Sequence, residues 1–93
     1  MVYLISYDLN KSGQNYDKLY DAIKKCSASW WHYLDSTWLI DTSYSALEIR
    51  EIIRKCVDAN DSFIVIEVTR NYGGLLPEKA WDWIYKHLGF SAA

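Results

Sequence analysis

The sequence predicts an α+β fold with four strands and three helices. Short stretches rich in β-branched and aromatic residues, typical of strands, alternate along the chain with stretches in which apolar residues recur at helical spacing. The chain has 93 residues, of which 51% are apolar and 24% charged, and this composition is that of a globular protein. Because two domains of half this length would each be too small to bury a core, we expect residues 1–93 to form one domain.

The first half of the chain predicts a strand, a helix and a hairpin. Val2–Asp8 combines β-branched and aromatic residues and leads into turn-forming residues at 8–13. Apolar residues then recur at helical spacing between Asn15 and Cys26. Two strand-like stretches follow, Ser29–Tyr33 and Thr37–Asp41, and the three residues between them suit a hairpin loop.

The next two elements are a helix and a strand. Ser45 and Glu48 have the spacing of a capping box, in which each side chain bonds a free backbone N–H at a helix start. We expect this helix to run to about Cys56. Ser62–Val68 is the most β-prone segment of the chain and predicts the fourth strand.

Pro77 and Gly89 bracket a third helix, because proline is tolerated in a first helical turn and glycine commonly ends a helix. We expect its packing face to consist of the residues at i, i+3, i+4 and i+7: Trp81, Ile84, Tyr85 and Leu88. Trp83 lies off this face, so it either covers a neighbouring edge or meets another chain.

The order strand, helix, strand, strand, helix, strand is that of the ferredoxin-like βαββαβ fold. Right-handed crossovers then predict a four-stranded antiparallel sheet in the order 4-1-3-2, with an extra C-terminal helix. The first two helices cover one face of this sheet, and the third helix or a second subunit covers the other. Cys26 and Cys56 would lie at opposite ends of the helical layer, so we expect no disulfide between them.

The charge and the N-terminal segment limit the function. A net charge of −2 argues against a broad cationic field for nucleic acid or anionic lipid, although a local basic patch remains compatible with it. Residues 1–5 lack the features of a secretion signal, and no apolar run approaches the roughly 20 residues of a membrane span. We therefore expect a cytoplasmic protein with no membrane partner.

Asp8 is the first candidate for chemistry. It ends a central strand beside a loop, where a carboxylate can hold a hard cation or an attacking water. The predicted topology brings it together with Asp35 and Ser36, and places Asp41 and Glu67 at the opposite edge. The alternative is structural, since Asp8 can accept hydrogen bonds from the following turn or face the positive end of a helix.

Other polar residues have simpler explanations. His32 shares a strand face with Trp30, and we expect it to be half-buried or at an interface. His87, in the last turn of the third helix, fits a surface position that complements the helix dipole. Arg50 and Arg54 lie one turn apart on the predicted second helix. A solvated helix face explains this spacing as well as a row of phosphate-binding residues does.

Aromatic residues are more numerous than a core of this size needs. The chain has five Trp, eight Tyr and two Phe. Some of them are therefore expected to face a partner. We predict a homodimer with Trp30, Trp31 and Trp38 in its interface.

Two segments resemble a known family. Val-Tyr-Leu-Ile-Ser-Tyr-Asp at 2–8 and Leu-Asp-Ser-Thr-Trp-Leu-Ile at 34–40 resemble the small CRISPR-associated adaptation endonucleases and their relative, virulence-associated protein D. The chain is most similar to small bacterial and phage proteins labelled SinR-like. The likeness covers the four predicted strands, which is most of the chain, through short motifs.

The resemblance implies a ferredoxin-like homodimer with metal-dependent endonuclease activity, directed at RNA. Tyr7-Asp8 matches the family's Tyr-Asp, whose aspartates from both subunits hold a divalent metal, so Asp8 would bind Mg²⁺ or Mn²⁺ and act in catalysis. Ser36-Thr37-Trp38 matches a second motif, so Ser36 would assist orientation. Where the family has basic residues near the second strand, residues 30–33 here are Trp-Trp-His-Tyr.

Two other functions fit the sequence. The chain can be a non-catalytic dimer whose aromatic surface binds a protein or single-stranded nucleic acid, because bases stack on Trp and Tyr. The acidic net charge favours a protein partner over RNA or DNA. Alternatively, the tryptophans serve dimerisation alone.

Overall fold

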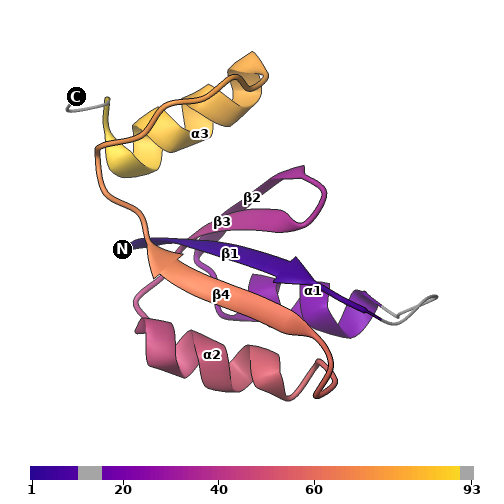
Figure 1. The fold of residues 1–93 in the computed structure, drawn as a ribbon. Coiled ribbons are helices and arrows are strands. Elements are labelled where there is room, and N and C mark those ends of the chain that lie inside the picture. The colour runs from indigo at the N-terminus through magenta and orange to yellow at the C-terminus, as the bar shows by residue number, and fades with distance from the viewer. Residues whose placement is uncertain (11–15, 91–93) are drawn as a thin grey trace.

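The computed structural model describes residues 1–10 and 16–90 (Figure 1). Seven elements follow one another in the predicted order: β1 (Val2–Asp8), α1 (Asp17–Lys25), β2 (Ser29–Leu34), β3 (Thr37–Asp41), α2 (Ala46–Arg54), β4 (Ser62–Glu67) and α3 (Glu78–Leu88). The predicted helix start at Asn15 and residues 11–13 of the predicted turn at 8–13 lie outside the described residues.

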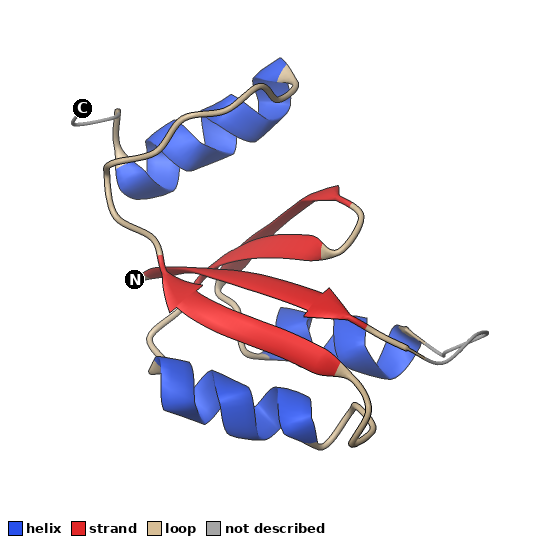
Figure 2. Cartoon of the chain, in the orientation of Figure 1, coloured by secondary structure: helices blue, strands red, loops and turns tan. Residues whose placement is uncertain are grey.

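The four strands form one antiparallel sheet in the order β2-β3-β1-β4, which confirms the predicted strand order. β1 lies inside the sheet and pairs with β3 on one side and β4 on the other. α1 and α2 pack on one face of the sheet, and α3 lies on the other side (Figure 2). The N-terminal strand is therefore the element on which both layers depend.

The larger core lies between the sheet and α1 and α2. Tyr3, Ile5 and Tyr7 alternate along β1 and point into it. The buried side chains that complete this core are Leu19, Ile23, Cys26, Trp38, Ile40, Ile49 and Ile53. The predicted capping box starts α2: the Ser45 hydroxyl accepts from the Glu48 N–H at 3.2 Å, and the Glu48 carboxylate accepts from the Ser45 N–H at 3.0 Å.

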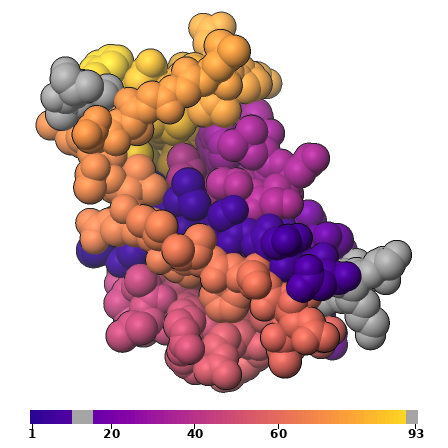
Figure 3. Space-filling model, in the orientation of Figure 1, coloured from indigo at the N-terminus to yellow at the C-terminus, as the bar shows by residue number. Residues whose placement is uncertain are grey.

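The smaller core lies on the opposite face and consists of five buried residues, namely Val2, Trp31, Leu39, Ala80 and Ile84. α3 supplies Ala80 and Ile84, and Gly89 ends this helix with a φ of 84°, which a glycine adopts without strain. Figure 3 shows α3 and the segment before it over the end of the molecule near β2, while β4 stays at the surface. α3 therefore covers only part of this face.

The packing face of α3 differs from the prediction. Tyr85 is 39% exposed and does not belong to the core. Ala80 takes its place and is fully buried beside Ile84 in the smaller core. Trp83 covers a neighbouring edge, one of the two alternatives: it packs against the smaller core, and its indole N–H donates to the Ser29 hydroxyl of β2 at 2.9 Å.

The two cysteines are free thiols. Both line a groove between α1 and α2, together with Ala22, Tyr44 and Ile52. Burial raises the pKa of Cys26, and its thiol donates to the Ile23 carbonyl at 3.3 Å. Cys26 is therefore a protonated, small apolar group in the core. Among the described residues, no helix has the length and apolar composition to cross a membrane.

The prediction that three tryptophans form a dimer interface needs correction. Trp38 is 1% exposed and Trp31 is 2% exposed, because alternation along β2 and β3 directs them into the two cores of the same chain. The Trp31 indole N–H has no hydrogen-bond partner among the described residues. Trp30 is 43% exposed, so it is the one of the three that offers surface to a partner.

We expect Trp38→Ala to lower the free energy of unfolding by about 3–5 kcal/mol, because it leaves a cavity in the larger core. Trp30→Ala removes a partly exposed ring and should cost about 1 kcal/mol or less. Guanidinium unfolding followed by far-UV circular dichroism measures both values. A Trp38→Ala chain of unchanged stability but altered sedimentation would instead favour the interface role.

Candidate functional site

Asp8, Asp35 and Ser36 share one edge of the sheet, as the sequence predicted. The Tyr7 N–H donates to the Ser36 carbonyl at 3.1 Å, which joins the end of β1 to the β2–β3 loop. The Tyr7 hydroxyl donates to the Asp35 carbonyl at 3.4 Å. Asp8 itself is exposed and pairs in register with Ser62 of β4. Both loop contacts run through Tyr7, so this residue positions the loop beside Asp8.

The Asp8 carboxylate makes no hydrogen bond or ion pair to the described residues. The structural alternative, in which this carboxylate accepts hydrogen bonds from the following turn, involves residues 11–13, which lie outside the described residues. Residues 1–10 and 16–90 contain no group of three or more His, Cys, Asp or Glu side chains that could hold a metal ion. Mg²⁺ commonly takes one or two carboxylates and fills its other positions with water and phosphate. A metal at Asp8 would thus need ligands from a second subunit or a substrate.

A cluster of aromatic side chains packs around Tyr7 and supports the β2–β3 loop. The Trp38 indole N–H donates to the Tyr7 hydroxyl at 3.1 Å. Trp38 also stacks on His32, with 4.1 Å between ring centroids, and lies 5.3 Å from the ring of Tyr20. A His32 ring nitrogen lies 3.1 Å from the Asp35 carbonyl. His32 is thus half-buried, one of the two expected alternatives, and serves the same loop.

Burial is the largest cause that raises the pKa of Tyr7 well above its usual value, and the hydrogen bond to Tyr20 adds to it. The Tyr7 hydroxyl therefore stays protonated and acts as a donor rather than as an acid or base. Sequence reasoning missed this network, because Trp38, Tyr20 and His32 come from three different elements. The alternation within β3 was the one available signal, since it places Trp38 on the same face as Ile40.

Trp30 carries the exposed end of this aromatic group. Its ring lies 5.1 Å from that of Trp38, and the Lys24 ammonium lies 4.9 Å from its centroid. A cation over an indole face is a weak attraction in exposed positions. The pair presents a flat ring and a positive charge on the α1–β2 side of the molecule, which suits a stacked base or an aromatic side chain.

Asp41 lies at the opposite edge from Asp8, as predicted, because β1 and β3 are antiparallel and Val2 pairs with Asp41. Its carboxylate lies 2.7 Å from a His87 ring nitrogen and 3.3 Å from the N-terminal ammonium of Met1. His87 is not the surface residue that the sequence suggested: its side chain is 15% exposed and stacks on Trp83. Asp41 and His87 are 46 residues apart, so no local pattern could have joined them.

Part of the sheet stays open on the α3 side. A row of paired residues crosses it from β4 to β2: Ile64, Ser6, Thr37 and Leu34. The Ser6 and Thr37 hydroxyls lie 3.4 Å apart, and the flanking Ile64 and Leu34 are about half exposed, as is Ile66 beside them. We call these five residues the open face. Asp8 lies two residues from Ser6 along β1 and therefore on the same side of the sheet.

No protein-family model and no curated protein matches this chain. The family resemblance therefore stands on the motifs at residues 2–8 and 34–40 alone.

The contacts of Asp41 with His87 and the N-terminus predict that part of the free energy of unfolding is lost at acid pH. Partial burial raises the pKa of Asp41, but the hydrogen bonds and charges of His87 and the N-terminus outweigh it and leave the pKa below its usual value. The charged carboxylate thus stabilises the fold above the unfolded-state pKa of about 3.9, and this stabilisation is lost as pH falls through the lower folded-state pKa.

We therefore expect the free energy of unfolding to fall more steeply from about pH 5 to about pH 2 in the native chain than in Asp41→Asn. The difference should stay below about 1 kcal/mol, since the carboxylate is partly exposed. Urea unfolding across this pH range measures it, with Asp82→Asn on α3 as the control. Parallel profiles for the native chain and Asp41→Asn would contradict the expectation.

Proposed function

We propose that this chain is a ferredoxin-like subunit of a homodimer that acts on nucleic acid, in the manner of the adaptation endonucleases that it resembles. The observation that carries the proposal is the open face, where exposed apolar residues and the Asp8 carboxylate lie on one side of the sheet. Apolar surface of this kind on a sheet is commonly covered by another sheet.

Two copies stacked through their open faces would bury Ile64, Ile66 and Leu34 of each subunit. Packed sheets lie about 10 Å apart, a distance that side chains from both sheets span. A two-fold axis near the ends of the β1 strands would then give Asp8 a symmetry mate. Two carboxylates together supply what one subunit lacks for holding a divalent cation.

The proposed reaction is hydrolysis of an RNA phosphodiester. Mg²⁺ or Mn²⁺, when bound, lowers the pKa of a coordinated water and neutralises charge on the phosphate. Asp8 from each subunit would hold the metal, and Ser36, on the adjacent loop, would orient the phosphate by hydrogen bonding. Tyr7 fixes this loop through its two contacts, so it acts as a positioning residue.

The open face predicts how dimerisation responds to charge. We expect Ile64→Glu and Ile66→Glu to shift the chain to monomer, because each would place a carboxylate in an apolar interface. Sedimentation velocity measures the change. Leu47→Glu is the matched control, since Leu47 is an exposed leucine on α2, on the other side of the molecule. If Leu47→Glu dissociates the dimer and Ile66→Glu does not, the subunits pair elsewhere.

The proposed reaction predicts that RNA cleavage depends on Asp8. With Mn²⁺ present, we expect cleavage of labelled single-stranded RNA to fall by at least about 100-fold in Asp8→Asn, as for loss of an essential group. Ser36→Ala should cost about 10-fold, and Asp82→Asn, an exposed control on α3, should cost nothing. Cleavage that persists in Asp8→Asn, or that resists EDTA, removes Asp8 and the metal from the reaction.

A non-catalytic binding module is the second candidate, and Trp30 favours it. Its exposed ring with Lys24 above it offers a stacking platform that needs no metal and no second carboxylate. Salt separates the possible partners: affinity for single-stranded RNA or DNA should fall steeply as salt rises, whereas a protein partner held by aromatic contacts should respond little.

A further inference from the structure

The outer edge of β4 is open. Within the described residues, β4 pairs only with β1. The Val68 N–H donates to the Val2 carbonyl at 2.8 Å. Because bonding direction alternates along an antiparallel strand, the even-numbered residues of β4 also bond toward β1. The N–H and C=O groups of Phe63, Val65 and Glu67 therefore point away from the sheet, where another extended chain could pair with them.

The two edges of the sheet differ in how they are protected. Along β2, the pairing register shifts between Trp31 and Leu34, and such an irregularity disrupts the ladder of free backbone groups. Along β4, the register with β1 is continuous from Ser62 to Glu67, and the strand contains no Lys or Pro. Those residues are common means of blocking an edge. β4 is therefore the edge that remains competent for pairing.

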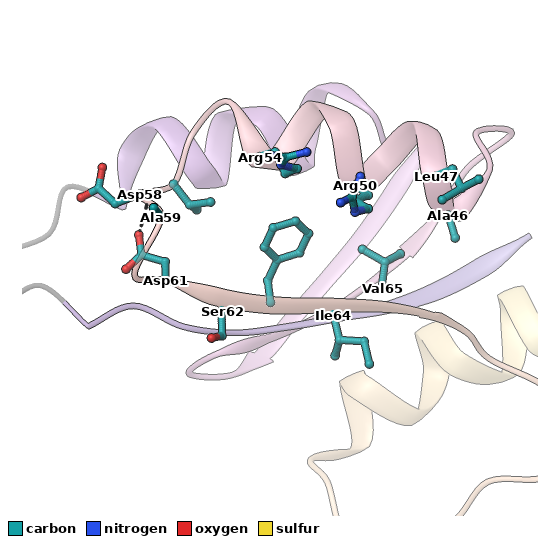
Figure 4. A pocket seen from close by; sticks show the side chains of 12 residues that line it. Ala46, Leu47, Arg50, Arg54, Asp58, Ala59, Asp61, Ser62, Ile64 and Val65 are labelled. Atoms are coloured by element: carbon teal, nitrogen blue, oxygen red, sulfur yellow. Dashed lines mark hydrogen bonds between the residues drawn. The ribbon is translucent and has the colours of Figure 1, made fainter.

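A groove of about 800 Å³ runs between this edge and α2 (Figure 4). Val65 points from the strand toward α2 and Ile64 points to the opposite side (Figure 4). Leu47, Arg50 and Arg54 line the helix side of the groove. A strand added beside β4 would thus have one row of side chains under α2 and the other row beside Ile64 on the open face.

The middle of the groove is cationic. Arg54 makes no hydrogen bond or ion pair to the part of the chain that the structure describes. Arg50 contacts its neighbour Glu51 at 2.6 Å, but both side chains are at least half exposed, and such a surface pair contributes little. Asp61, at one end of the groove, uses its carboxylate to accept two backbone N–H groups of the adjoining loops, at 2.8 and 3.0 Å.

We propose that this groove binds an extended acidic segment of a partner protein, which pairs with β4 as a fifth strand. The acidic side chains of the segment face Arg50 and Arg54, and its alternate apolar side chains lie beside Ile64 and Ile66. Main-chain pairing supplies affinity, and the arginines supply specificity. This surface lies outside the Asp8 edge, so the inference goes beyond the proposed hydrolysis.

The spacing of the arginines defines the segment. Residues four apart on a helix are about 6 Å apart along its axis, and alternate residues of a strand are about 6.6 Å apart. Two acidic residues separated by one residue would therefore meet Arg50 and Arg54 together. The pattern acidic-apolar-acidic-apolar satisfies both the helix side and the open-face side of the added strand.

The edge itself favours a peptide over nucleic acid. It presents alternating donors and acceptors, which another peptide backbone matches, whereas phosphate offers acceptors only. A second copy pairing through β4 is the remaining occupant, and it would form a concentration-dependent dimer through this edge.

The test uses the full chain and a fluorescein-labelled peptide of about seven residues with alternating Glu and Val. Fluorescence anisotropy should show saturable binding with a Kd well below about 1 mM, the limit of a weak contact. An isomer with adjacent Glu residues should bind about 10-fold more weakly, because it cannot reach both arginines. A peptide N-methylated at the amides facing β4 should bind no better than background.

Variants of the protein locate the site. Arg50→Glu combined with Arg54→Glu should weaken binding at least about 10-fold, whereas Lys79→Glu combined with Lys86→Glu, the same charge change on α3, should not. Val65→Pro removes an outward N–H without breaking a bond to β1, so it should reduce binding while circular dichroism shows that the fold is retained. The N-methylated peptide tests pairing independently of any variant.

Three results would overturn the proposal. The first is equal binding of the alternating and adjacent isomers, because the arginine spacing would then play no part. The second is displacement of the peptide by single-stranded RNA with a stronger affinity, which would make the groove a phosphate site. The third is a concentration-dependent dimer that Val65→Pro abolishes and that excludes the peptide, which would assign the edge to a second copy.

Discussion

The structure depends on one constraint: β1 lies inside the sheet, and both of its faces must be removed from water. Tyr3, Ile5 and Tyr7 on one face meet two helices and are fully covered. Val2 and Leu4 on the other face pack in the smaller core to which α3 contributes, whereas Ser6, further along the strand, belongs to the open face. The sheet is therefore closed on one side and half closed on the other. Its open half holds the open face and the Asp8 carboxylate.

The hydrogen bond between Trp38 and Tyr7 links the closed side to the candidate site. Trp38 lies in the larger core, yet its N–H fixes the hydroxyl that reaches the Asp35 carbonyl. The β2–β3 loop beside Asp8 is thus held by side chains from three strands: Tyr7 of β1, Trp38 of β3 and His32 of β2. Such support from packed strands keeps a site more rigid than a free loop would. A substitution at Trp38 acts on the stability of the core and on this edge together, so changes there do not report on the edge alone.

The sequence was sufficient to predict the helices and strands, because local periodicity and the Ser45–Glu48 capping box mark them. It was also sufficient to predict their order in the sheet and the placement of Asp8 near Ser36, because these follow from chain connectivity. It was not sufficient for the roles of the aromatic residues. Trp30 and Trp38 have the same chemistry and neighbouring rings, but Trp30 lies on the edge strand β2 and Trp38 on the interior strand β3, so only Trp38 is covered. His87 is a similar case, since its partner Asp41 is distant in sequence and meets it only after α3 has docked.

The open face and the β4 edge make different demands on a partner. The open face combines apolar side chains with a central pair of hydroxyls, so it suits another side-chain surface, such as a sheet. The edge offers backbone groups, and α2 across the groove offers two arginines, so together they suit an extended chain of opposite charge. Ile64 and Ile66 belong to both surfaces, because they lie on the outermost strand. A strand added at the edge would widen the apolar area beside them, so peptide binding and sheet stacking would reinforce rather than exclude each other.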